Sequence, residues 1–99
     1  MQEHRMETID EIYQAAFENC TYLSNVDLGI VKRISERAFR GSSSLKSITI
    51  PKTVIRIEAE AFLLCSNMEN VYFERLPEYI GVDVFEPDVI IYGSSGSSV

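Results

Sequence analysis

Hydrophobic residues recur along the chain in a fixed order. An isoleucine, three further residues, a small residue and a phenylalanine follow one another four times, beginning at Ile12, Ile34, Ile57 and Ile80, in steps of 22, 23 and 23 residues. In the first three copies, apolar residues also follow the phenylalanine at six, nine and eleven positions. Self-similarity at a period of about 20–50 residues indicates a repeat architecture.

Each unit combines two periodicities. Around the phenylalanine, apolar residues lie four, five and eight positions after the isoleucine, a spacing that predicts a short helix. In the first unit these residues are Ile12, Ala16, Phe17 and Cys20. The longest helix is predicted over residues 9–19, with Thr8 and Glu11 as a capping box at its start. Farther along, apolar and polar residues alternate, which predicts strands over residues 25–28, 47–50, 70–73 and 89–92.

Neither a short helix nor a single strand could bury its apolar face alone. The units are therefore expected to stack, so that equivalent apolar residues form continuous columns. The clearest column predicted in this way consists of Phe17, Phe39, Phe62 and Phe85. The sequence thus predicts an α/β solenoid whose core is a stack of such columns.

The positions of glycine, serine and proline residues agree with this organisation. We expect a flexible N-terminal segment over residues 1–8, a repeat domain over 9–92 and a Gly/Ser-rich tail over 93–99. Pro51 is expected to end a strand at Ile50, because proline has no amide donor.

The turn after each phenylalanine should depend on the residue two positions later. Gly41 and Asn19 tolerate the left-handed conformation that closes such a turn. Leu64 tolerates this conformation poorly and Pro87 cannot adopt it, so the third and fourth turns are expected to differ from the first two.

Composition and charge narrow the classes of partner. Of the 99 residues 45% are hydrophobic, and the net charge is −6. A chain of this size fits one small domain, and its negative charge argues against nucleic acid as a partner. The apolar stretches are far shorter than the roughly 20 residues of a membrane helix, so no membrane insertion is expected. The start of the sequence shows no apolar region typical of a signal peptide.

Candidate chemistry is sparse. Cys20 and Cys65 lie at equivalent positions two units apart, which predicts a separation of ~10 Å and therefore free, buried thiols. Together with His4, the sole histidine, they provide no metal-ligand spacing, so neither a metal nor another cofactor is assigned. The serines at 42–44 have no histidine nearby in the sequence, and acidic residues at helix starts are explained by the helix dipole. No catalytic residue is assigned, and the chain is predicted not to be an enzyme.

One stretch points to a family. Residues 38–57, read as AFRGSSSLKSITIPKTVIRI, closely resemble the BspA-type leucine-rich repeat, whose pattern is roughly AFxGCxxLxxIxIPxxVxxI. The resemblance extends over residues 9–92, with departures at Ser42, Met68 and Glu74 and a one-residue shortening between Leu23 and Ile34. It implies a right-handed leucine-rich-repeat solenoid of about four 22–23-residue units, with a parallel sheet on the concave face and short helices opposite. It also implies a surface or secreted protein engaged in adhesion.

The strand residues that point away from the core are the candidate partner-binding site. These are Asn25, Asp27, Ser47, Thr49, Asn70, Tyr72, Ile90 and Tyr92. Tyr72 and Tyr92 are the preferred anchors, because rigid aromatic side chains supply contact area at little entropic cost. The alternative is that both tyrosines simply suit a half-exposed sheet.

Two functional hypotheses follow. The first is a non-enzymatic protein–protein interaction module, of adhesion or surface-recognition type, that binds another protein through its concave strands. The second is a structural spacer or capping fragment of a longer array, suggested by the few units and the Gly/Ser tail. Leu63 and Leu64 replace polar or small residues of the other units, so one of them should be exposed. That leucine is either a weak homo-oligomer contact or an ordinary surface residue.

Overall fold

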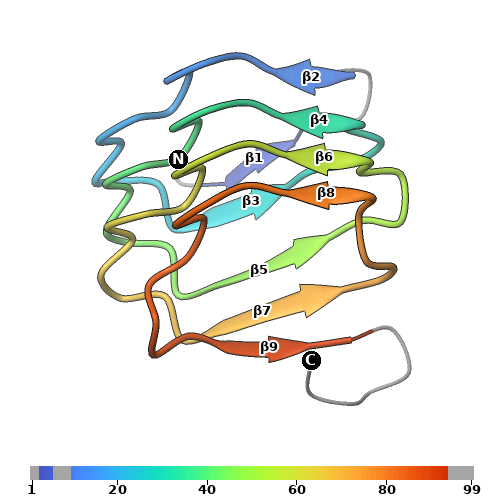
Figure 1. Ribbon diagram of the computed structural model, residues 1–99. Coiled ribbons are helices and arrows are strands. Elements are labelled where there is room, and N and C mark those ends of the chain that lie inside the picture. Colours follow the sequence, from blue (N-terminus) through green and yellow to red (C-terminus); the bar gives the residue numbers. More distant parts are fainter. Residues whose placement is uncertain (1–2, 6–9, 94–99) are drawn as a thin grey trace.

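The protein is a parallel β-solenoid of about four turns (Figure 1). The structure, a computed structural model, describes residues 3–5 and 10–93 of the chain. Within these ranges the chain forms nine short strands and no helix. The strands are β1 (Glu3–Arg5), β2 (Glu11–Ile12), β3 (Asn25–Asp27), β4 (Arg33–Ile34), β5 (Ser47–Ile50), β6 (Arg56–Ile57), β7 (Asn70–Phe73), β8 (Tyr79–Ile80) and β9 (Ile90–Tyr92).

Strands from successive units pair side by side and in parallel. Strands β2, β4, β6 and β8 form one sheet, β5, β7 and β9 a second, and β1 and β3 a third. We call one circuit of the chain a coil, so that the four coils contain the strand pairs β2 and β3, β4 and β5, β6 and β7, and β8 and β9. The isoleucines that open the repeated pattern pair directly with one another, Ile12 with Ile34, Ile34 with Ile57 and Ile57 with Ile80. The stacking of units predicted from the sequence is confirmed.

The phenylalanine column is also confirmed. Neighbouring rings lie 5.2, 5.1 and 5.4 Å apart between centroids, with interplanar angles of 7, 3 and 10°. These spacings are close to the separation of about 4.8 Å between paired strands, so each ring stacks on the ring of the next coil. Phe39 and Phe62, in the middle of the column, are buried.

The predicted short helices, including the longest one over 9–19, are wrong. Thr8 and Ile9 lie outside the described residues, and residues 14–19 form turns. In this segment the amides of Ala15, Phe17 and Asn19 donate to carbonyls of the next coil at 3.1, 2.7 and 2.7 Å. The amides of Ala16 and Glu18 donate three residues back along the chain. An α-helix would use these amides for bonds to the fourth preceding residue. The fold is therefore all-β within the described residues, and the α/β assignment is corrected.

Each unit contains a residue in the left-handed backbone conformation, and this explains why the helix-like spacing of apolar residues led to a wrong prediction of helices. The third residue after each repeated isoleucine has a positive φ. These residues are Ala15 (57°), Arg37 (58°), Glu60 (61°) and Asp83 (52°). A left-handed residue interrupts a right-handed helix, yet the turn still directs the small residue and the phenylalanine inward. The same apolar spacing thus serves two backbone paths, and periodicity alone does not separate them.

The turn that follows each repeated phenylalanine was also expected to differ between units. The backbone φ of Leu64 is 61°, that of Asn19 is 58° and that of Gly41 is 79°. All three residues are therefore in the left-handed region. The expectation that the Leu64 turn would differ in conformation is wrong. Its amide nevertheless has a different acceptor, because it donates to the Glu86 side chain at 2.9 Å, whereas the amides of Asn19 and Gly41 donate to backbone carbonyls.

Other expectations concern strand ends and chain termini. Strand β5 ends at Ile50, as predicted from Pro51. Within the predicted N-terminal segment 1–8, residues Glu3–Arg5 form β1 and pair with β3. Residues 1–2 and 6–9 and the tail from 94 onwards lie outside the described residues. No helix in the described part of the chain has the length and hydropathy to cross a membrane.

Candidate functional site

The predicted site residues lie on the outer side of the strands β3, β5, β7 and β9. Most of them are exposed, whereas Asn70 and Tyr92 are half-buried. Two rows cross the sheet of β5, β7 and β9 in register. One row contains Ser47, Asn70 and Ile90, and the other contains Thr49, Tyr72 and Tyr92. The structure thus brings six of the eight residues together on one sheet.

Asn25 and Asp27 are separated from this sheet by a break. They lie on β3, which pairs with β1 and has no ladder to β5. Two features of the sequence account for the break. The connection between Leu28 and Val31 is one residue shorter than its counterpart between Ile50 and Val54. In addition, Pro51 cannot donate the bond that its counterpart Glu74 makes to Ile50, at 3.0 Å.

The break coincides with an open hollow of about 670 Å³. Its polar lining includes four of the predicted residues, Asn25, Asp27, Ser47 and Thr49, together with Glu74. The local turn is fixed by the Asp27 carboxylate, which accepts a hydrogen bond from the Gly29 amide at 3.0 Å. The predicted face therefore has a polar end with a hollow and an aromatic end.

The aromatic end is a stacked pair. The rings of Tyr72 and Tyr92 lie 5.0 Å apart between centroids, with an interplanar angle of 14°. Tyr72 is 43% exposed, and its neighbour Ile90 is 49% exposed. Stacking holds each ring in one orientation, so contact with a partner would require little further ordering of these side chains.

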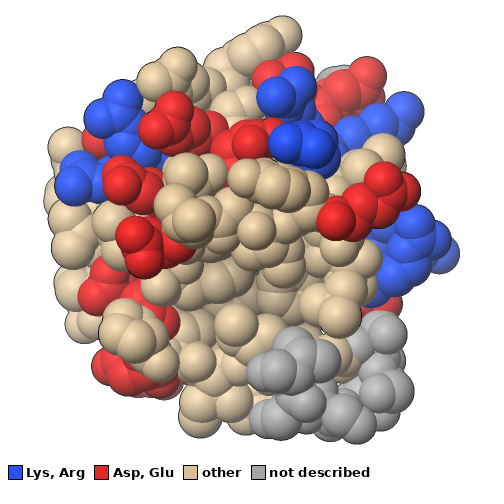
Figure 2. All heavy atoms as spheres, in the orientation of Figure 1, with Lys and Arg blue, Asp and Glu red and all other residues tan. Residues whose placement is uncertain are grey.

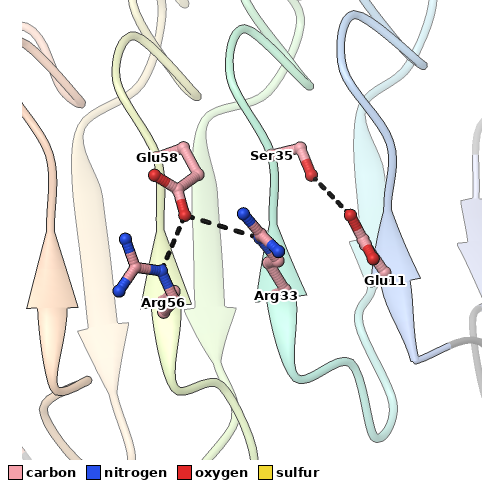
Figure 3. Close-up of polar contacts among 5 residues, drawn as sticks. All are labelled: Glu11, Arg33, Ser35, Arg56 and Glu58. Carbon is pink, nitrogen blue, oxygen red and sulfur yellow. Dashed lines mark hydrogen bonds and ion pairs between the residues drawn. The ribbon is translucent and has the colours of Figure 1, made fainter.

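A second polar surface, on the sheet of β2, β4, β6 and β8, was missed by sequence reasoning. Its outward residues pair across the strands, with Glu11 opposite Arg33, Arg33 opposite Arg56 and Arg56 opposite Tyr79. Figure 3 shows the guanidinium groups of Arg33 and Arg56 converging on Glu58, and Ser35 directed at Glu11. The signal that could have found it is the row of polar residues immediately before each repeated isoleucine.

Short contacts organise this surface. The Glu58 carboxylate lies 2.8 Å from Nε of Arg56 and 3.4 Å from Nε of Arg33. The hydrogen bond from Arg56 is the main reason why the pKa of Glu58 lies below its usual range. The Arg56 guanidinium also lies 4.3 Å from the centre of the Tyr79 ring, a cation–π contact that helps to fix its plane. Ser35 donates to Glu11 at 3.0 Å.

Replacing Glu58 by glutamine is expected to remove a pH-dependent contribution to stability. Because the folded state lowers the pKa of Glu58, its ionised form stabilises the protein above the pKa of the unfolded chain. This contribution is lost as the pH falls through the lower, folded-state pKa. Urea unfolding should therefore show E58Q to be less stable than the parent protein at pH 7, with the difference shrinking towards pH 3. A difference that stays constant over this range would contradict the assigned pairing, and E36Q, on the same surface, is the control.

The cysteines are free, as predicted. Cys65 is buried, but Cys20 is only half-buried, which corrects the expectation for that thiol. Burial raises the pKa of Cys65 to about 11, and its thiol donates to the Phe39 carbonyl at 3.1 Å. Ser42, at the equivalent position of the preceding coil, donates to the Phe17 carbonyl at 2.7 Å. Serine can therefore replace cysteine in this column, because each side chain donates to the carbonyl of the phenylalanine at the equivalent position of the preceding coil.

In the part of the chain that the structure describes, no three His, Cys, Asp or Glu side chains gather closely enough to hold a metal ion. The side chain of His4 lies outside the described residues.

Comparison with known protein families agrees with the stacked coils and the phenylalanine column. The family described as BspA type Leucine rich repeat region matches residues 4–92, in 6 copies. The chain belongs to the BspA-type leucine-rich repeat family. Comparison with curated proteins and with solved structures gave no match. Leucine-rich repeats of this kind generally act as protein-interaction modules and scaffolds rather than as enzymes. In this BspA-type chain, the repeated residues form the core and leave the outward-facing residues of the strands to vary between coils.

Proposed function

We propose that this BspA-type solenoid binds another protein through the outer face of β5, β7 and β9 and the adjoining hollow beside β3. The observation that carries the proposal is the stacked pair of Tyr72 and Tyr92 beside the exposed Ile90. These residues combine aromatic and aliphatic area on one side of a rigid sheet, a composition typical of the centre of protein interfaces.

The polar end of the same face supports specificity. Asn25, Asp27, Ser47 and Thr49 surround the hollow of about 670 Å³ and offer hydrogen-bond donors and acceptors. An interface with an aromatic centre and a polar rim excludes water from the anchors while it orients the partner. Adhesion to another protein at a cell surface is the biological setting that the family favours.

Changing Tyr72 and Tyr92 together to alanine should weaken partner binding by about tenfold or more, since interface anchors each contribute more than about 1 kcal/mol. The immobilised parent protein would first be used to isolate a binding protein, and affinities would then be measured with the purified partner. Y13A is the matched control, because Tyr13 is 70% exposed and lies next to β2.

The result that contradicts the proposed face is equal affinity of the parent protein and the double variant. A thermal melt of the double variant separates a binding defect from unfolding. Because both rings lie on the outer side of the sheet, the melting temperature should change little compared with the change in affinity.

The alternative function is a structural spacer or cap within a longer array. It is favoured by the last coil, in which Ile80 is 42% and Val82 70% exposed, whereas Ile34 and Ile57 are buried. Such an exposed coil offers a surface on which another coil can stack. In that case the double tyrosine variant would have no effect on any partner, while Ile80→Lys would prevent joining to a neighbouring repeat unit.

A further inference from the structure

We propose that the last coil of the solenoid binds an extended segment of another protein, in which basic and apolar residues alternate, as an additional strand beside β8. The site is the open edge of a sheet. It is separate from the outer face that carries the tyrosine pair, so it does not depend on the function proposed above. The argument rests on unpaired backbone groups, on exposed apolar side chains and on the charge of the last coil.

Each coil uses equivalent backbone groups to hold the next coil. At the junction of the third and fourth coils, the carbonyl of Ile57 accepts a hydrogen bond at 2.8 Å, and the amide of Phe62 donates one at 2.9 Å. Both bonds recur at the earlier junctions. In the last coil, the counterparts of these two groups are the Ile80 carbonyl and the Phe85 amide.

The counterparts in the last coil are unpaired. Within the described residues, β8 pairs with β6 alone, so its other edge is open. In the same part of the chain, four backbone groups along this edge have no hydrogen-bond partner, namely the carbonyls of Glu78 and Ile80 and the amides of Asp83 and Phe85. Acceptors followed by donors along one edge are what a further parallel strand requires.

Apolar side chains beside this edge are exposed, although their counterparts are buried. Ile80 is 42% exposed and Phe85 is half-buried, whereas the equivalent Ile57 and Phe62 are 0% and 1% exposed. Val82 lies between them in the sequence and is 70% exposed. A strand that covers these side chains would remove apolar area from water, which stabilises the complex together with the backbone pairing.

The charge of the last coil favours a basic segment. Residues 76–93 contain no Lys, Arg or His, and they contain four carboxylates, those of Glu78, Asp83, Glu86 and Asp88. The Glu86 carboxylate already accepts the Leu64 amide, whereas the other three are exposed. Figure 2 shows acidic side chains without basic ones at the lower left of the molecule, where the turns of the last coil lie. Arginine or lysine at alternate positions of an added strand would meet this negative charge.

Tyr79 provides a second reason for a basic residue. Its ring is 42% exposed, and the Arg56 guanidinium of the preceding coil lies 4.3 Å from its centre. The two residues occupy paired positions of β8 and β6. An arginine at the paired position on the other side of β8 would be placed to make an equivalent cation–π contact.

A second copy of this chain is a poor occupant of the same edge. Its first coil, residues 10–23, contains Asp10, Glu11 and Glu18 and no basic residue, so two acidic ends would repel each other. The pairing of β1 with β3 is a further obstacle. With β8 of one copy beside β2 of the next, β9 would meet the place that β1 already occupies. Nucleic acids and anionic membranes are repelled by the same carboxylates.

The test is titration of the full chain with a short fluorescent peptide in which arginine and valine alternate, followed by anisotropy at low ionic strength. We expect binding that weakens with added salt, and weaker binding of the same peptide with glutamine in place of arginine. The double variant E78Q/D83N should bind about three- to tenfold more weakly. The control D10N/E36Q removes two charges from exposed positions of the first two coils and should keep the affinity of the parent protein.

Hydrogen exchange would locate the bound peptide. Exchange of the Asp83 and Phe85 amides should slow on binding, because both would donate to carbonyls of the added strand. The double variant is expected to fold, since both side chains are exposed and asparagine tolerates the φ of 52° at Asp83. If a thermal melt shows otherwise, the single variants E78Q and D83N decide, because each should weaken binding.

Four results would overturn the proposal. They are no binding of the basic peptide by the parent protein, an equal loss in D10N/E36Q, protection from exchange that lies outside residues 78–85, and self-association of the parent protein in sedimentation that Ile80→Lys abolishes. The last result would assign the open edge to a second copy. The Y72A/Y92A variant should bind the peptide as the parent protein does, which separates this edge from the tyrosine face.

Discussion

Replacing Phe39 by alanine is expected to lower the free energy of unfolding by about 3–5 kcal/mol. Phe39 is fully buried and stacks on Phe17 on one side and on Phe62 on the other, at 5.2 and 5.1 Å. Its removal leaves a cavity between neighbouring coils whose backbones are held by the pairing of β4 with β2 and β6 and of β5 with β7. The surrounding residues therefore have little freedom to close the gap, which places the cost in the range of large-to-small substitutions in rigid cores.

Denaturant unfolding followed by circular dichroism would measure this loss. Tyr22→Ala is a suitable control, because it removes an aromatic ring that is 65% exposed and should change stability by less than about 1 kcal/mol. A Phe39 variant as stable as the parent protein would be incompatible with the stacked column. Since a solenoid of so few units is close to the minimum for stability, this loss is a large fraction of the total free energy of unfolding.

The second large effect is expected at Gly81, where alanine should destabilise the last coil by about 1–3 kcal/mol. An added Cβ would lie 2.7 Å from the backbone nitrogen of Ala59 and 3.0 Å from the backbone carbon of Glu58. These atoms belong to the preceding coil and are held by the pairing of β6 with β8. The clash can be relieved only by moving the two coils apart, because backbone atoms have no alternative rotamer.

Hydrogen exchange would localise the damage. In G81A, amides of β8 and β9 should exchange faster, whereas amides of β4 and β5 should keep most of their protection, since each coil contacts only its neighbours. Val82→Ala, at the next position, removes part of a side chain that is 70% exposed and is the matched control. Unchanged protection in β8 of G81A would show that the approach of the two coils is looser than the structure describes.

The two outer surfaces differ in chemistry. The face of β5, β7 and β9 offers the stacked tyrosines and a polar hollow, and the face of β2, β4, β6 and β8 offers two arginines held by Glu58. Both depend on the same physical circumstance. Stacking brings equivalent positions of successive coils to about 4.8 Å, so that neighbouring side chains on a face act together although they are some 22–23 residues apart in the sequence.

The sequence contained most of the core. The recurrence of isoleucine and phenylalanine predicted the columns, and the alternation of apolar and polar residues predicted the positions of β3, β5, β7 and β9 to within a residue or two. Those predictions succeeded because burial depends on which side chains are apolar and on their spacing, both of which are visible in the sequence. The eight candidate residues on the outer side of these strands were found for the same reason.

The sequence did not determine the backbone path between those strands. The predicted helices are turns with left-handed residues such as Ala15 and Arg37, and two-residue strands such as β4 and β6 give too short a pattern to detect. The amides of Ala15 and Arg37 donate to carbonyls of the next coil, and those of Arg33 and Arg56 donate to carbonyls of the preceding coil. The conformation therefore depends on neighbours that are distant in the chain.

By itself, then, the sequence of this protein determined a stack of repeated units, their register and the apolar columns within them. Only the tertiary structure decided that the units contain no helix in the described residues, that the sheet is interrupted between β3 and β5, and that Arg33, Arg56 and Glu58 meet. The physical reason is that hydrophobic burial is specified residue by residue, whereas hydrogen bonds and charge pairs between coils exist only once the coils are stacked.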